Sequence, residues 1–211
     1  MNKEVINLYI SVNKKATAEI VEKKSRFIAH ITHVENEEDA KYFIDTIKKE
    51  HFDARHNVYA YILKNGTKKY SDDGEPSKTG GFPVLDLLEK ENITDVVCVV
   101  TRYFGGTLLG VGGLIRAYSL AAKCAIENAG VSEKEKCIIL KITSDYQYLE
   151  KIKHIVKKQK AILDEIAYTD KAVIYVITPK TSLENTKSAF ADEFGVSIKI
   201  ETEKEIYHDK I

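Results

Sequence analysis

Residues 99–118 read VVTRYFGGTLLGVGGLIRAY and place five glycines between an apolar run and a helix-like run, with Arg102 and Arg116 flanking the glycines. Residues 94–101, TDVVCVVT, predict a fully buried strand, and residues 114–129 predict a long apolar helix that ends at Gly130. Glycine has no side chain and adopts positive φ readily, so it permits close backbone approach. The segment therefore predicts a strand, a tight loop and a helix whose first N–H groups favour an anion.

This strand–loop–helix supplies the candidate ligand-binding residues. Arginine forks bind phosphate, and an exposed aromatic ring beside arginine can stack on a base. The alternative is that the glycines only allow tight turns and close helix–sheet packing. The spacing fits neither the Gly-Lys-Ser/Thr phosphate loop nor the dinucleotide fingerprint. The residues expected to bind an anion or RNA are Arg102, Tyr103, Phe104, Gly105, Gly106, Gly110, Gly112, Gly113 and Arg116.

A second irregular stretch, residues 70–81, reads YSDDGEPSKTGG and carries three carboxylates within four positions. Oxygen ligands suit a hard cation, but the spacing does not match a calcium loop, and a structured turn is the favoured interpretation. We expect this loop to border the same cleft as residues 99–118, because loops on a rigid scaffold commonly carry binding. The cleft-bordering candidates are His56, Asp72, Asp73, Glu75, Ser77, Lys78 and Thr79.

Composition narrows the class of protein. The 211 residues carry 32 basic and 32 acidic side chains, which argues against sequence-blind nucleic-acid binding driven by bulk charge. Cys98, Cys124 and Cys137 lie in separate apolar runs without a CxxC, a pattern typical of reduced, buried thiols rather than of disulfides or a zinc site. With no signal-peptide pattern and no apolar run of membrane-spanning length, we expect a cytoplasmic protein with no membrane partner.

The remaining pattern predicts an α+β fold in two domains, residues 1–133 and 134–211. In the first, strands are expected at 16–22, 24–34, 57–64 and 67–71, with helices at 36–50 and 84–90. Residues 131–136, VSEKEK, are short and polar and predict the boundary. After them, strands at 137–143, 161–168, 171–178 and 196–203 and helices at 145–159 and 182–193 give the order β-α-β-β-α-β, a ferredoxin-like unit.

Several of these stretches together resemble the IMPACT family of YigZ-like proteins, in its bacterial two-domain form. The resemblance covers about residues 25–130, through KKSRFIAH, DARHNVYAY, SDDGEPSKTGGFP and the highly specific TRYFGG…LG…GGL…RAY string. The family usually reads EPSGTAGKP, whereas Lys78, Gly80 and Phe82 stand here, and Leu108 replaces a common lysine. The expectation of anion binding therefore rests on Arg102 and Arg116.

The resemblance implies an N-terminal domain like the second domain of ribosomal protein S5 and a ferredoxin-like C-terminal domain. Both are similar to consecutive domains of the translocating elongation factor. Eukaryotic members bind an activator of a translation-controlling kinase. We accordingly expect a non-enzymatic, translation-linked regulator without cofactor or metal, which binds RNA, the ribosome or a translation-related protein through its N-terminal domain.

Two alternatives stay open at this point. One is an enzyme acting on a phosphorylated small molecule, with His56, Asp72, Asp73 and Glu75 performing acid–base chemistry beside an anion site, which requires these side chains to converge on one cleft. The other is a module that binds a folded protein through an exposed apolar patch. The sequence leaves the oligomeric state open.

Overall fold

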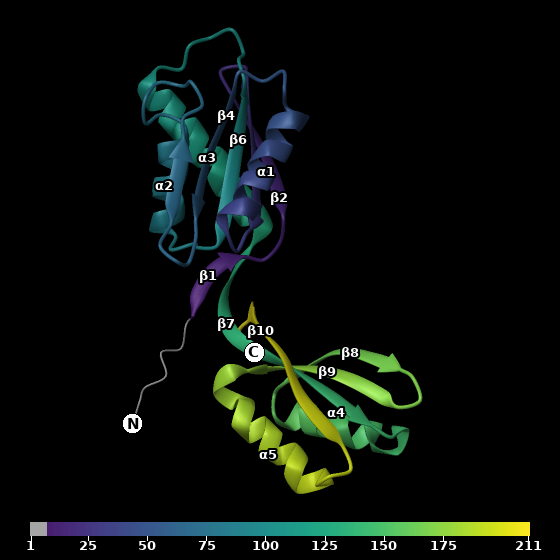
Figure 1. Ribbon diagram of the computed structural model, residues 1–211. Coiled ribbons are helices and arrows are strands. Elements are labelled where there is room, and N and C mark those ends of the chain that lie inside the picture. Colours follow the sequence, from purple (N-terminus) through teal and green to yellow (C-terminus); the bar gives the residue numbers. More distant parts are fainter. Residues whose placement is uncertain (1–7) are drawn as a thin grey trace, which may run out of the picture. The chain divides into compact units, whose positions relative to one another are not determined.

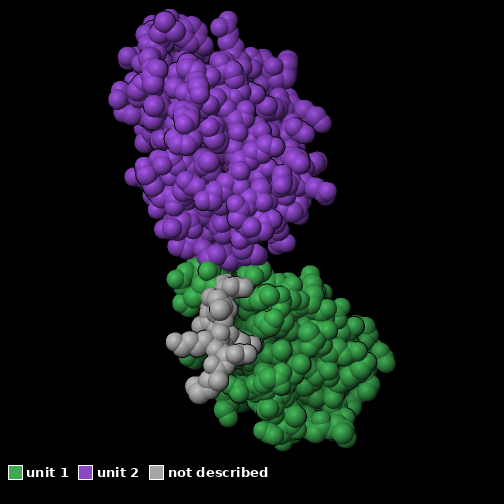
Figure 2. All heavy atoms as spheres, turned by 60° about the vertical axis from the view of Figure 1, so that its left-hand side comes forward, with its two compact units in different colours: residues 1–8, 133–211 green, residues 9–132 purple. Residues whose placement is uncertain are grey.

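The computed structural model describes residues 8–211, and these divide into two compact units. The N-terminal unit is Tyr9–Ser132, and the C-terminal unit comprises Leu8 and Glu133–Ile211; the two are coloured separately in Figure 2. Each unit combines its own β-sheet with helices and has its own hydrophobic core. The predicted α+β fold in two domains is therefore confirmed.

The sheet of the N-terminal unit has five antiparallel strands. Their order across the sheet is β2 (Ala16–Glu22), β3 (Ser25–His33), β6 (Val96–Tyr103), β4 (His56–Ile62) and β5 (Lys68–Ser71). A short strand that the sequence analysis did not predict, β1 (Tyr9–Val12), precedes them and forms a parallel bridge from Ile10 to Ile93. Strand β6, which leads into the glycine-rich segment, is thus the central strand.

Three helices cover the two faces of this sheet (Figure 1). Helix α1 (Glu37–Glu50) packs on one face, and α2 (Gly81–Lys90) and α3 (Val111–Ala129) pack on the other. Alternate side chains of β6 point to opposite faces of the sheet: Val97 and Val99 belong to the core under α1, and Cys98 belongs to the core under α2 and α3. Burial on both faces explains the continuous apolar run of β6.

The C-terminal unit has the β-α-β-β-α-β order that its hydrophobic pattern predicts. Within this unit the strands pair in the order β10-β7-β9-β8, all antiparallel, and α4 and α5 contribute to the same core. The elements are β7 (Val131–Ser144), α4 (Leu149–Lys158), β8 (Ile162–Tyr168), β9 (Ala172–Pro179), α5 (Leu183–Phe194) and β10 (Lys199–Asp209). This is the ferredoxin-like arrangement.

The two units divide between Ser132 and Glu133, inside the polar stretch 131–136 that the sequence marks as the boundary, and these residues form the first part of β7. Its charged side chains pair across the sheet with β10: Lys134 Nζ lies 2.6 Å from Asp209 Oδ1, and Lys136 Nζ lies 2.5 Å from Glu205 Oε1. The polar character therefore reflects an exposed, ion-paired stretch of strand rather than a loop.

Helices α2 and α3 each begin three residues earlier than the pattern indicates, at Gly81 and Val111. Pro83 is accommodated in the first turn of α2, where a missing N–H costs no intrahelical bond. The predicted helix ends agree with the structure: the Asn36 side chain accepts a hydrogen bond from Asp39 N at the start of α1, and Gly130 ends α3 at φ +65°. In the part of the chain that the structure describes, no helix is both long and apolar enough to cross a membrane.

Candidate functional site

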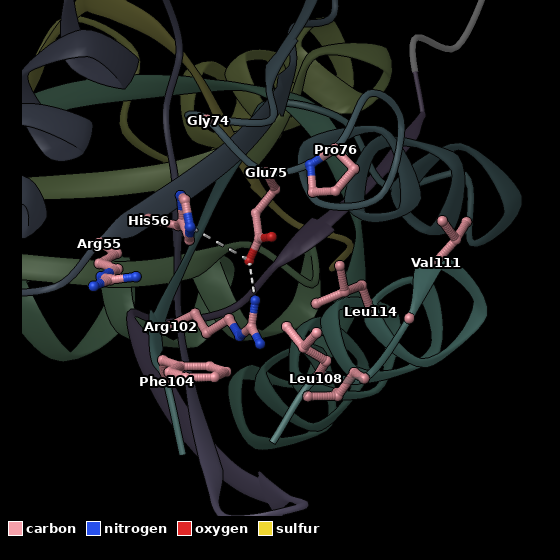
Figure 3. A pocket seen from close by; sticks show the side chains of 12 residues that line it. Arg55, His56, Gly74, Glu75, Pro76, Arg102, Phe104, Leu108, Val111 and Leu114 are labelled. Atoms are coloured by element: carbon pink, nitrogen blue, oxygen red, sulfur yellow. Dashed lines mark hydrogen bonds and ion pairs between the residues drawn. The ribbon is translucent and has the colours of Figure 1, made fainter. Parts of the chain in front are cut away.

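A pocket of about 420 Å³ lies beside the start of α3, and we call it the α3 pocket (Figure 3). Three segments that are distant in sequence line it. They are the start of β4, the loop after β5, and the stretch from the end of β6 into α3. The lining residues are Arg55, His56, Gly74, Glu75, Pro76, Arg102, Phe104, Leu108, Leu109, Gly110, Val111 and Leu114. The two motifs singled out in the sequence thus border the same cavity.

Glycines shape the turn from β6 into α3. A Cβ at Gly105 would lie 2.0 Å from the carbonyl carbon of Lys24, so only glycine allows the chain to pass the β2–β3 turn at this distance. Gly110 has φ +73°, which a residue with a side chain would adopt at a cost. It immediately precedes Val111, the first residue of α3. The packing explanation of these glycines therefore accounts for Gly105 and Gly110 by itself.

The floor of the pocket is a buried cluster of Glu75, Arg102 and Tyr118. Arg102 Nη1 and Tyr118 Oη both donate to Glu75 Oε1, each at 2.7 Å. The side chains of Glu75 and Arg102 are only 3% and 8% exposed. Burial raises the pKa of the Tyr118 hydroxyl, and its hydrogen bond to Glu75 raises that pKa further, so Tyr118 stays a proton donor to the carboxylate.

Two aromatic rings lie close to the Arg102 guanidinium. Its guanidinium carbon lies 5.5 Å from the ring centre of Phe27 and 5.6 Å from that of Phe104, within the range of cation–π attraction. Phe104 is 47% exposed and so forms part of the pocket wall. The Nε atom of Arg102 is buried and has no hydrogen-bond partner.

His56 faces Glu75 from the neighbouring strand, because the register of β4 against β6 places His56 opposite Arg102. Its Nδ1 lies 2.8 Å from the carbonyl oxygen of Asp73, and a carbonyl can only accept, so Nδ1 carries the proton. Its Nε2 is directed at Glu75 Oε1, 4.0 Å away, as drawn in Figure 3. His56 and Glu75 are thus the two acid–base candidates that converge.

Asp72 and Asp73 hold the loop together instead of entering the pocket. Asp72 Oδ1 accepts from the backbone N–H groups of Gly80 and Gly81, at 3.0 and 2.9 Å, and so caps the start of α2. Asp73 Oδ2 accepts from the backbone N–H of Asn57 at 2.7 Å, and Asp73 Oδ1 pairs with Lys48 Nζ at 2.9 Å. The four acid–base residues of the enzyme alternative therefore do not meet in one cleft.

The other loop candidates also have structural settings. Thr79 is buried and its hydroxyl donates to the carbonyl oxygen of Pro76 at 2.6 Å. Ser77 and Lys78 are exposed and do not line the pocket, and the Lys78 ammonium lies 5.3 Å from the ring centre of Phe82. Among residues 8–211, no three His, Cys, Asp or Glu side chains are grouped closely enough to hold a metal ion.

Tyr103 takes part in a hydrogen-bonded chain that does not include the pocket-lining residues. Its hydroxyl donates to Asp53 Oδ1 at 2.9 Å and lies 3.0 Å from His51 Nδ1. His51 Nε2 lies 3.1 Å from His30 Nε2, and His30 Nδ1 lies 3.1 Å from the hydroxyl of Thr17. Burial, followed by the proximity of His51, lowers the pKa of His30 to about 4.

Arg116 lies on α3 and is exposed, outside the pocket lining. Gly106 is exposed at φ +84°, and Gly112 and Gly113 belong to the first turn of α3. Arg55 and Tyr118 are site residues that were not predicted from the sequence. The only sequence feature that could have indicated Arg55 is its place directly before His56 in the DARHNVYAY motif. Tyr118 ends the RAY string, where its spacing predicts only another buried position on the apolar face of α3.

Residues 23–126 match the family described as the Impact N-terminal domain. IMPACT family member YvyE of Bacillus subtilis is 41% identical over 168 residues, covering 79% of this chain and 77% of YvyE. IMPACT family member YigZ of Escherichia coli is 31% identical over 174 residues, covering 81% of this chain and 85% of YigZ.

A solved structure, titled as the crystal structure of an hypothetical protein, matches 95% of this chain and 99% of its own chain. Its sequence identity is 27% and its TM-score is 0.62. The match therefore extends over both units, and the relatives above share most of their length with this chain. The chain belongs to the IMPACT family.

Proposed function

We propose that this protein is a non-enzymatic, translation-linked regulator that binds RNA on the ribosome through the surface around the α3 pocket. The observation that supports it is the convergence of the two motifs of residues 99–118 and 70–81 on one cavity. The family resemblance supplies the link to translation. The ribosome, a free RNA and a translation factor are the candidate partners, and the test below separates them.

The charges that would meet RNA are the exposed ones. Arg55 at the pocket and Arg116 on α3 are both exposed, and neither has an ion-pair partner within residues 8–211. Phe104 adds an exposed ring on which a base can stack. Arg102 acts differently, because its charge is already matched by Glu75.

A binding role also fits the chemistry of the pocket better than catalysis does. Acid–base catalysis on a phosphorylated substrate would need His56, Asp72, Asp73 and Glu75 at one place, and two of these four side chains are occupied by backbone N–H groups of the loop. Glu75 accepts two hydrogen bonds at one oxygen, which suits a fixed structural carboxylate.

The test is co-sedimentation of the purified protein with ribosomes at low salt, together with filter binding to RNA. We expect R116A and F104A each to weaken both interactions, with K123A as the matched control. Lys123 is exposed on the same helix, about 10 Å further along at 1.5 Å per residue. Binding should fall steeply between about 50 and 200 mM salt, because phosphate contacts release counterions.

A pull-down from lysate with and without nuclease separates the partner classes. Loss of the captured material after nuclease supports RNA. Retention of a translation factor after nuclease supports the protein-interaction alternative, for which Leu108 and Val111 supply exposed apolar surface at 82% and 60%. Absence of both ribosome co-sedimentation and RNA retention contradicts the proposed function.

A further inference from the structure

The α3 pocket combines a cationic end with apolar walls, and this combination goes beyond a surface for RNA. On one side are Arg55, His56, Glu75 and Arg102. On the other are the apolar side chains of Leu108, Val111, Leu114 and Pro76, while the Phe104 ring lies beside Arg102 (Figure 3). Leu109 completes the apolar lining. A volume of about 420 Å³ is that of a small-molecule site.

The charge balance at this pocket is positive. Two arginines face one carboxylate, and Arg102 Nη1 already neutralises Glu75 at 2.7 Å. The guanidinium of Arg55 is left over, since it has no hydrogen bond or ion pair within residues 8–211. An anion entering the pocket would thus meet a positive charge that has no ion-pair partner.

The first turn of α3 adds backbone donors. The first hydrogen bond of the helix runs from Leu114 N to the carbonyl oxygen of Gly110, so the N–H groups of residues 111–113 have no acceptor within the helix. Gly110 supplies no side-chain cap, and both Gly110 and Val111 line the pocket. The positive end of a 19-residue helix therefore opens onto the cavity.

A second feature of the pocket, independent of the helix, is the buried arginine Arg102 that lines it. Arg102 is 93% buried, since only 7% of its surface is exposed, and its Nε–H has no partner. A buried donor without a partner is costly, and native structures rarely leave one unexplained. In Figure 3 the Arg102 guanidinium lies below Glu75 and next to Leu108.

We propose that the α3 pocket binds a small organic anion, namely a carboxylate or phosphate monoester carried on an apolar group. Arg55, the outer edge of Arg102 and the first N–H groups of α3 would hold the anionic group. The leucines and Phe104 would enclose the apolar part. The inference shares Arg55 and Phe104 with the proposed RNA surface, but it is argued from the pocket alone and does not depend on the proposed function.

The test uses NMR titration of the full chain with phenylacetate and with phenyl phosphate. The reporters are the Arg102 Nε–H signal and the amide signals of Gly112 and Gly113. We expect saturable shifts with a dissociation constant of about 1 mM, as is usual for ligands of this size. Uncharged phenylacetamide and inorganic phosphate should each bind at least about tenfold more weakly, because each lacks one half of the recognised chemistry.

Two arginine variants provide the matched pair. R55A should weaken binding of the anionic probe at least about fivefold, through loss of a charge-assisted contact. R116A should change the dissociation constant of the anionic probe by less than about twofold, because Arg116 does not line the pocket. Equal loss in both variants, equal binding of phenylacetamide, or no saturable shift up to about 10 mM would overturn the proposal.

The anion could be free in the cell or be an end group of the partner. Phenyl phosphate added to the co-sedimentation assay distinguishes these sources: release from ribosomes assigns the anion to the partner, and retention assigns it to a free small molecule. If the titration shows no binding, the effect of R116A on co-sedimentation can still support the proposed function. If co-sedimentation is absent, the titration can still support the anion site. The two proposals can therefore be refuted independently.

Discussion

Replacing Arg102, at the floor of the α3 pocket, should destabilise the N-terminal unit. We therefore expect the main role of Arg102 to be structural. The Glu75 and Arg102 side chains are 3% and 8% exposed, so replacing Arg102 by methionine strands a carboxylate away from water. Breaking a buried ion pair at one partner costs about 3–5 kcal/mol. Tyr118 still donates to Glu75 in the variant, so we expect the lower end, about 3 kcal/mol, for R102M.

A double-variant cycle separates this cost from simple loss of packing. In R102M/E75Q the buried charge is gone and the glutamine oxygen still accepts from Tyr118. The double variant should therefore be more stable than R102M alone by at least about 1 kcal/mol, with a coupling energy in the range of contacting residues. R116A serves as the control, because an exposed arginine without a partner should change stability by less than about 0.5 kcal/mol.

The assay is urea unfolding of the full chain by far-UV circular dichroism, together with hydrogen exchange of the β6 amides. Exchange is needed because the chain has two units and no tryptophan, so a single optical transition does not isolate the N-terminal unit. R102M within about 0.5 kcal/mol of the parent, or additive effects of R102M and E75Q, would refute the reasoning.

Three further predictions concern other parts of the N-terminal unit. The pKa of His30 is about 4 in the folded protein, against 6.5 in the unfolded chain. The contribution of neutral His30 to stability is therefore complete above pH 6.5 and is lost as the pH falls toward 4. The free energy of unfolding of H30Q, measured at several pH values, should lack up to about 3 kcal/mol of this pH dependence. G105A should cost about 3 kcal/mol or more through the clash with the Lys24 carbonyl, whereas G106A, strained but in open space, should cost about 1 kcal/mol, and urea midpoints measure both. Burial raises the pKa of Cys98 to about 12, so iodoacetamide at pH 8 should modify half-buried Cys124 in the native protein and leave Cys98 unreacted until the chain unfolds, as peptide mass mapping would show.

The fold was largely predictable because local pattern and final burial agree in most elements. Alternation in the C-terminal unit predicts its strand order, and Asn36 and Gly130 mark helix ends by capping chemistry that is local. The strand conformation of residues 131–136 was not predicted, since their charges are paired with partners on β10 about 70 residues later. No property of the segment itself distinguishes such a strand from a polar linker.

The site was predictable as a pair of motifs and not as a set of contacts. Glycine-rich and acidic loops are visible in the sequence, and their meeting at one pocket follows from strand order. Two features of the site depend on tertiary structure and not on local sequence. They are the strand register that sets His56 opposite Arg102 and the ion pair of Glu75 with Arg102. Arginine in a strand signals a surface charge by default, so a buried pair of this kind is not expected from sequence pattern.

This pairing changes which charges can act on a ligand. With Arg102 neutralised by Glu75, the charges left for the proposed anion are Arg55 and the start of α3, while Arg116 lies outside the pocket lining. Replacing Arg102 and Arg116 together, the natural test from the sequence, would mix loss of folding with loss of binding. The separable test is Arg55 against Arg116, because both side chains are exposed, neither supports the core, and only Arg55 lines the pocket. If their losses of function divide between anion and ribosome, the pocket and the surface are two sites on one scaffold.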